Sequence, residues 1–190
     1  PVAGTRSAIV LCARFADEAN EVVPPWAGEL FDLERPGSFA HFYSTMSFGR
    51  LQVLGKVAAR VYASYSPASQ YLAEDPSTYG HFARFAREIL VQADRDIDFS
   101  RFDNDGPDGL PSSGDDDGVV DAVFVLLFSA PANFLVGQAT GIGHLGMEED
   151  FVTDDAGADG QLVRIDPSLG TLQRGRTFAE AAGSLTHEYG

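Results

Sequence analysis

The pattern of apolar and polar positions predicts four strands. Continuous apolar runs at residues 7–15 and 119–128 are typical of strands buried on both faces of a sheet. Residues 51–62 alternate between apolar and polar side chains, which predicts one long strand or a hairpin with Gly55 as a bulge or turn. A shorter run at residues 161–165 predicts a weak strand.

Three further segments have helical character. Ser38 is a good N-cap for a helix that extends to about Met46, and Gly49 ends this helix. Residues 79–94 carry one apolar stripe at spacings of three and four. The last helix opens with a capping-box pattern from Thr177 to Glu180 and runs to the end of the chain. The stripe of the middle helix consists of Phe82, Phe85, Ala86, Ile89 and Ala93.

Segments of strand and helix character alternate, which indicates an α/β or α+β fold and a single domain. The chain has 190 residues, enough to bury a sizeable core. Residues 129–160 are glycine-rich and predict a mostly irregular segment; a loop of that length is more often functional than accidental.

Charge and composition narrow the function classes. The net charge is −15, from 28 acidic and 13 basic residues, and no cluster of Lys or Arg suits nucleic acid binding. No apolar run approaches the ~20 residues that cross a bilayer, so we expect no membrane span. Residues 1–5 lack a signal-peptide pattern and read as a mature or trimmed start. The single Cys12 excludes an internal disulfide and reads as a small buried hydrophobe.

The last helix has an apolar face, and the opposite face carries His187. With Phe178 as the reference, Ala182, Leu185 and Tyr189 fall within about 40° of it at 100° per residue. By the same geometry His187 lies at about 180°, and Glu188 lies on a flank. We therefore expect the helix to bury one side and to present His187 on the other.

Residues 186–190, Thr-His-Glu-Tyr-Gly, read as the first part of the zinc-binding motif H-E-x-x-H. In that motif two histidines one helical turn apart bind Zn²⁺, and the glutamate acts as general base. The second histidine would be the residue after Gly190. A His-Glu pair alone is weak evidence, and the alternative is an exposed polar helix face.

Five segments, in matching order, give this motif a context. Residues 7–15 form an opening strand followed by an acidic loop, and residues 37–51 match a segment of the form S-x-x-x-Y-Y-x-x-x-S-Y-G-x-L. Phe42 and Phe48 depart from that segment by lacking a tyrosine hydroxyl. The remaining segments are residues 98–106, Gly143-His144 and residues 183–190. In these features the chain resembles the immune inhibitor A-like family of secreted zinc metallopeptidases.

The resemblance implies a zincin-like α+β fold, with a twisted mixed sheet, packed helices and the active-site helix at the C-terminus. It implies a zinc endopeptidase that hydrolyses extracellular proteins, with His187 as the first zinc ligand and Glu188 as the general base. The second histidine and the third ligand would lie beyond Gly190. We therefore expect residues 1–190 to be the N-terminal part of a catalytic domain that is incomplete at its C-terminus and inactive alone.

A non-catalytic module that keeps the peptidase fold, calcium-stabilised or adhesive, is the alternative function. The residue that follows Gly190 in the full-length protein discriminates between the two, since a histidine there favours the enzyme.

An acidic loop between two predicted elements favours a calcium site. If residues 107–116 loop out as an insertion, the remainder reads D-N-D-G-D-G-V-V-D. Asp103, Asp105, Asp117 and Asp121 then take calcium-ligand positions, although Phe124 stands where a bidentate Glu belongs. The resemblance supports this excision, because family members commonly carry an uninterrupted D-N-D-G-D-G there. A solvated acidic loop is the alternative.

His144 is a further candidate, because it lies in the long glycine-rich segment beside Met147. It either lines the substrate cleft or is an ordinary surface histidine. The sequence contains no G-x-S-x-G elbow, phosphate-binding glycine loop or C-x-x-C spacing.

Overall fold

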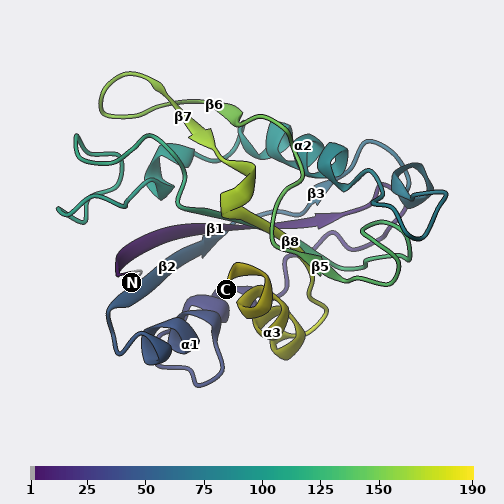
Figure 1. Cartoon of the computed structure of the whole chain (residues 1–190), viewed down its shortest axis with the longest axis horizontal. Coiled ribbons are helices and arrows are strands. Elements are labelled where there is room, and N and C mark those ends of the chain that lie inside the picture. The colour runs from purple at the N-terminus through teal and green to yellow at the C-terminus, as the bar shows by residue number, and fades with distance from the viewer. Residues whose placement is uncertain (1–2) are drawn as a thin grey trace.

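The computed structural model describes residues 3–190 and contains one mixed sheet of six strands and a separate pair of strands (Figure 1). In chain order the strands are β1 (Gly4–Arg14), β2 (Leu51–Val57), β3 (Tyr62–Ala63), β4 (Ala122–Leu127), β5 (Gly141–Ile142), β6 (Phe151–Ala156), β7 (Leu162–Ile165) and β8 (Gly170–Arg174). The main path of the sheet is β2–β1–β4–β8–β5, and β3 pairs with the end of β1. All neighbours in this sheet are parallel except β5, which runs antiparallel to β8.

The two apolar runs form the centre of the sheet, as their composition predicts. Strand β1 is buried from Ser7 to Ala13, and all six residues of β4 are buried. These strands pair in parallel from Ala8 opposite Ala122 onward. Strands covered on both faces need apolar side chains in both directions, which explains why both runs are continuous.

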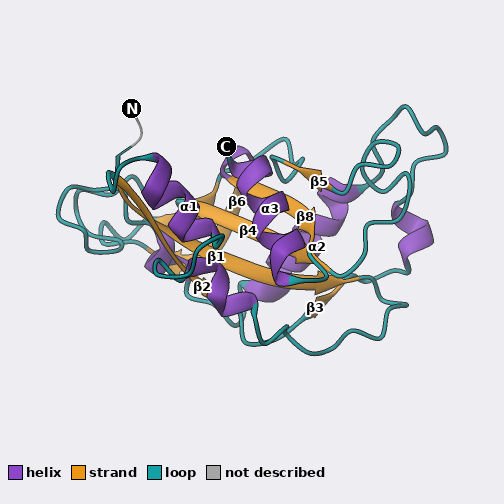
Figure 2. Cartoon of the chain, turned by 90° about the horizontal axis from the view of Figure 1, so that it is seen from below, coloured by secondary structure: helices purple, strands orange, loops and turns teal. Residues whose placement is uncertain are grey.

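Three α-helices cover the two faces of the sheet (Figures 1 and 2). They are α1 (Phe39–Met46), α2 (Phe82–Ala93) and α3 (Phe178–Tyr189). Helix α2 packs on one face, over Ile9, Leu11 and Val125. Helices α1 and α3 share the other face, over Val10 and Phe124. The fold is therefore α+β with a mixed sheet, as the sequence predicts.

The predicted caps form at α1 and α3. The Ser38 hydroxyl accepts a hydrogen bond from the His41 N–H at 3.0 Å. The Thr177 hydroxyl accepts one from the Glu180 N–H at 3.2 Å. The return bond of the capping box forms one residue early, because the Glu180 carboxylate accepts from the N–H of Arg176 at 3.0 Å.

Helix α2 begins at Phe82, after His81 as N-cap, and so starts three residues later than the helical pattern predicts. All members of its apolar stripe are buried, which confirms the stripe as a core face.

Two details of the predicted strands are wrong. Strand β2 ends at Val57 and β3 is a separate strand, and both pair in parallel with β1, so residues 51–62 form neither one long strand nor a hairpin. Gly55 lies inside β2 and is neither a bulge nor a turn; a side chain there would overlap the ring of Phe31. The position is glycine because an aromatic ring occupies the space of its Cβ.

Residues 129–160 contain more regular structure than predicted. They include β5 and β6. Strand β6 pairs in antiparallel orientation with β7, which is the strand predicted at residues 161–165. Strand β8 was not predicted at all. It carries polar side chains at Thr171 and Gln173, yet both are buried, so it lacks the apolar run that marks β1 and β4.

Among the described residues, no helix has the length and apolar character that a membrane span requires.

Candidate functional site

Helix α3 is oriented as its periodicity predicts. Ala181, Ala182 and Leu185 are buried against the sheet, whereas His187 is exposed and Glu188 is half-buried. The imidazole is therefore on the outer face of the helix, and the carboxylate is on its flank.

Aromatic side chains hold the C-terminal turn of α3 against α1 and β4. The ring of Tyr189 lies 5.2 Å from that of Tyr43, 5.4 Å from that of Phe39 and 5.6 Å from that of Phe124. The Tyr43 hydroxyl also donates a hydrogen bond to the carbonyl of Thr186 at 2.9 Å. Edge-to-face aromatic pairs and this bond fix the turn that carries His187 and Glu188.

Glu188 lies directly over the edge strand of the sheet. A Cβ at Gly141 would overlap the carboxylate of Glu188, and a Cβ at Gly143 would lie 2.8 Å from its backbone carbonyl. Burial raises the pKa of Glu188 above its ordinary value, and nearby His187 opposes this shift. The two glycines thus leave room for a partly desolvated carboxylate beside the strand.

A cavity of about 490 Å³ opens beside Glu188. Its wall includes Met46, Leu51 and Leu169, and Gly143 and Glu188 lie on its rim. Strand β5 pairs with β8 on one side, and no described residue pairs with its other edge. Such an edge accepts an extended peptide as an additional strand.

Of the zinc ligands that the sequence predicts, the described residues contain only His187, so they form no complete zinc site. Within residues 3–190, one cluster of three potential metal ligands is present; it consists of aspartates and does not include His187. A catalytic zinc site takes three protein ligands, so two would have to come from elsewhere.

His144 follows the end of β5 by two residues along the chain and is exposed. Its ring packs against Phe82 of α2, with ring centroids 5.5 Å apart. The contact places the imidazole toward the α2 face of the sheet.

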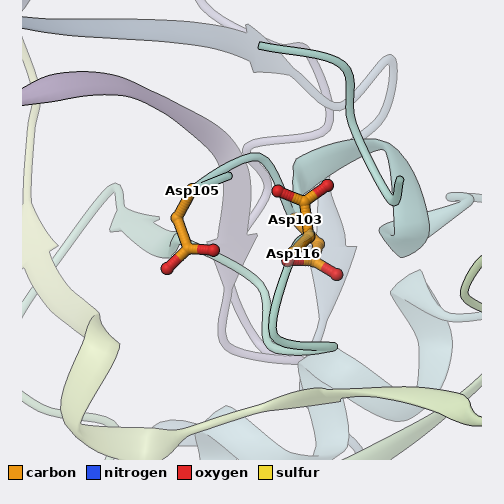
Figure 3. Close-up of side chains that lie close together, drawn as sticks. All are labelled: Asp103, Asp105 and Asp116. Carbon is orange, nitrogen blue, oxygen red and sulfur yellow. The ribbon is translucent and has the colours of Figure 1, made fainter. Parts of the chain in front are cut away.

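The acidic loop before β4 gathers three carboxylates (Figure 3). Oxygen atoms of Asp103, Asp105 and Asp116 all lie within 4.8 Å of one another. The ends of the intervening segment meet, because the N–H of Gly106 donates to Asp116 Oδ1 at 2.7 Å. The segment between them therefore leaves and returns at one point, but Asp116, which the predicted insertion of residues 107–116 excludes, joins the cluster.

Asp103 is the buried member of this cluster. It is 1% exposed, one oxygen accepts from the N–H of Gly118 at 3.1 Å, and the other has no hydrogen-bond partner within residues 3–190. Burial, reinforced by Asp116 and Asp117, raises the pKa of Asp103 to about 7. A buried carboxylate oxygen without a donor is costly unless a proton or a cation satisfies it.

The other two predicted calcium ligands lie outside the three-carboxylate cluster. Asp117 accepts a hydrogen bond from the N–H of Val119 at 2.9 Å. Asp121 accepts from the N–H of Ser7 at 2.5 Å and lies 3.8 Å from the guanidinium of Arg6. Burial raises the pKa of Asp121 to about 7.

Sequence reasoning missed Asp116 and the glycines under Glu188. Asp116 stands in a run of three aspartates, so the sequence alone does not identify which of them turns inward. Gly141 and Gly143 form a local Gly-x-Gly signal, but their role depends on Glu188, more than forty positions away along the chain.

No model of a known protein family matches the chain, and a search of curated proteins found no match.

Proposed function

We propose that the chain is the N-terminal part of the catalytic domain of a secreted, zincin-like zinc endopeptidase. The observation that carries the proposal is the position of Glu188: its carboxylate lies over the glycine-lined edge strand, one residue from an outward-facing His187. The resemblance to the immune inhibitor A-like family supports the same reading.

In this proposal each residue has a defined task. His187 binds the metal through an imidazole nitrogen, together with ligands outside residues 1–190. A bound zinc ion supplies a Lewis acid that polarises the peptide carbonyl and acidifies water. The free edge of β5 aligns the substrate backbone, and Glu188 takes the proton from the attacking water.

The cavity beside Glu188 and the edge strand favour an extended peptide as substrate, and the resemblance implies that this peptide belongs to an extracellular protein. A non-catalytic module with the same fold remains the competing function, and the identity of the residue after Gly190 and a test of hydrolysis separate the two.

The test is casein hydrolysis by the full-length protein, with and without a metal chelator. We expect the chelator and the substitution Glu188→Gln each to reduce hydrolysis by a factor of about 10³ or more, because the base and the metal act in the same step. Glu149→Gln removes one exposed glutamate that lies beside α2, on the opposite face of the sheet from α3, and is the matched control. Full activity of Glu188→Gln would overturn the proposal.

A calcium ion at the acidic loop is the second part of the proposal. Ca²⁺ prefers carboxylate oxygens, and Asp103, Asp105 and Asp116 offer them within one small space. The unpartnered oxygen of Asp103 supports this reading, because a cation would satisfy it.

Calorimetric titration with Ca²⁺ tests this part separately from catalysis. We expect Asp105→Ala and Asp116→Asn to weaken binding by about tenfold or more, since each removes a charged ligand. Asp17→Asn, an exposed aspartate beyond the opposite end of β1 from Arg6 and Asp105, is the matched control for the loss of one charge. Heatless, identical traces for the wild type and Asp105→Ala would exclude a calcium site.

A further inference from the structure

A second cavity, of about 520 Å³, lies far from Glu188 and is not used by the proposed peptidase. It lies between β2 and the segment that begins with the short helix η3 (Phe99–Phe102). Along β2, Leu51 and Val53 turn toward α1 and α3, so Leu54 and Lys56 contribute to the wall of this cavity.

The charge of this cavity is opposite to that of the molecule. The chain carries a net charge of −15, yet Lys56 and Arg101 line the cavity and none of its lining residues is acidic. Within residues 3–190, neither cation has a carboxylate within 4.0 Å, whereas most arginines there are paired with Asp or Glu. Lys56 is also the only lysine in the sequence.

Buried polar groups lie beside the two cations. Asn104 lines the cavity and is 4% exposed, and no group of the described residues donates a hydrogen bond to its Oδ1. Its Nδ2 lies 3.5 Å from the hydroxyl oxygen of Ser7, which also lines the cavity. Rotation of the amide by half a turn exchanges these atoms, so that Oδ1 accepts from Ser7 and Nδ2 becomes a donor without an acceptor.

The wall also has an apolar part, made by Leu54, Phe102 and Pro111. Two cations, hydroxyl and amide groups and an apolar wall are the features that bind a small organic anion. A cavity of this size is within the usual range for small-molecule sites.

We propose that this cavity binds a small organic oxyanion, whose phosphate or carboxylate group contacts Lys56 and Arg101 and whose apolar part lies against Leu54 and Phe102. Arginine suits this role because its planar guanidinium donates two parallel hydrogen bonds to an oxyanion, and lysine adds a compact charge. The cavity shares no lining residue with the cavity beside Glu188 or with the three-carboxylate cluster.

Phenyl phosphate and benzoate are suitable probes, because they share a ring and differ in the anionic group. The experiment titrates each into the ¹⁵N-labelled chain at fixed ionic strength and follows backbone amide shifts by NMR. We expect saturable shifts at Ser100, Arg101 and Asn104 with one of the two probes. Tighter binding of phenyl phosphate assigns a phosphate ligand, and tighter binding of benzoate assigns a carboxylate ligand.

Lys56→Gln and Arg101→Gln should each weaken binding by about tenfold, because each removes one charge-assisted contact. Both side chains belong to exposed residues, so we expect the variants to fold. Arg50→Gln, an exposed arginine just before β2 and outside the cavity, is the matched control and should leave affinity unchanged.

Three results would overturn the proposal. One is the absence of saturable shifts with both probes at concentrations of about 10 mM. Another is equal weakening by Arg50→Gln, which would mean that the probes respond to overall charge. Shifts confined to residues outside the cavity in the wild type would also refute the site, whether or not any variant folds.

Discussion

At the scale of single residues, the space above β5 decides where the Glu188 carboxylate can lie. A side chain at Gly141 would occupy the position of that carboxylate, which is the far end of a flexible side chain and can move away. We predict that Gly141→Ala leaves the free energy of unfolding within about 1 kcal/mol of wild type. Peptidase activity of the full-length protein should fall by about tenfold or more, because a displaced base loses its alignment. Thermal unfolding and casein hydrolysis measure the two effects.

Gly183→Ala is the matched control, because it makes the same change on the exposed side of α3. A Cβ there meets nothing within 4 Å, and alanine favours a helix interior over glycine by about 1 kcal/mol. The control should therefore be slightly more stable than wild type. An active, undisturbed Gly141→Ala enzyme would show that the carboxylate does not need its present position.

Periodicity alone was enough to derive the direction of His187, because a helix fixes the angle between successive side chains. The directions of the aspartate side chains in the acidic loop do not follow from periodicity. Asp116 and Asp117 are neighbours of the same type, and only the closure of the loop by Gly106 turns Asp116 toward Asp103. Helical geometry is local, whereas loop geometry depends on contacts that the sequence does not display.

At the scale of elements, an ion-pair network anchors the start of α3. The Glu180 carboxylate accepts from the side chains of Arg174 at 2.8 Å and Arg176 at 2.9 Å. Hydrogen bonds from Arg176, with a contribution from Arg174, lower the pKa of Glu180 from 4.5 to about 2. The network connects the end of β8 to the first turn of the helix.

The stabilisation by Glu180 should depend on pH in a defined direction. Because the folded-state pKa lies below the unfolded value, the stabilisation is complete above about pH 4.5 and is lost as the pH falls toward about 2. We predict that Glu180→Gln unfolds about 1–2 kcal/mol more easily at neutral pH, a value reduced for the partial exposure of the pair. This deficit should shrink in urea unfolding as the pH falls from about 4.5 toward about 2.

Glu149→Gln is the control, since Glu149 is exposed and forms no ion pair within the described residues. A Glu180→Gln deficit that stays constant over the pH range would contradict the assigned network.

Strand β8 shows why one central element escaped sequence reasoning. Thr171 and Gln173 look like surface residues, but the Thr171 hydroxyl donates to the Gln173 amide oxygen at 2.5 Å. This pairing satisfies the Thr171 hydroxyl and the Gln173 amide oxygen inside the sheet, while Gln173 Nε2 has no acceptor among the described residues. Propensity and periodicity do not predict such pairings, whereas continuous apolar runs identify β1 and β4 as strands.

At the scale of the whole molecule, one sheet separates two apolar cores. Alternate residues of β4 enter different cores: Phe124 faces α1 and α3, and Leu127 belongs to the core under α2. Because strand side chains alternate between faces, neighbouring substitutions in β4 act on opposite layers. The layer that contains Phe124 also supports Tyr189 and, through it, the turn that carries Glu188.

We therefore predict different consequences for two large-to-small substitutions in the same strand. Phe124→Ala should cost about 3–5 kcal/mol and Leu127→Ala about 2–5 kcal/mol, because both create buried cavities. Hydrogen exchange followed by mass spectrometry should show lost protection in α1 and α3 for Phe124→Ala, and in α2 for Leu127→Ala. Equal loss in all three helices for both variants would mean that the two cores open as one cooperative unit. If the layers are separable, Phe124→Ala should also reduce peptidase activity of the full-length protein more than Leu127→Ala, since it alone loosens the packing behind Glu188.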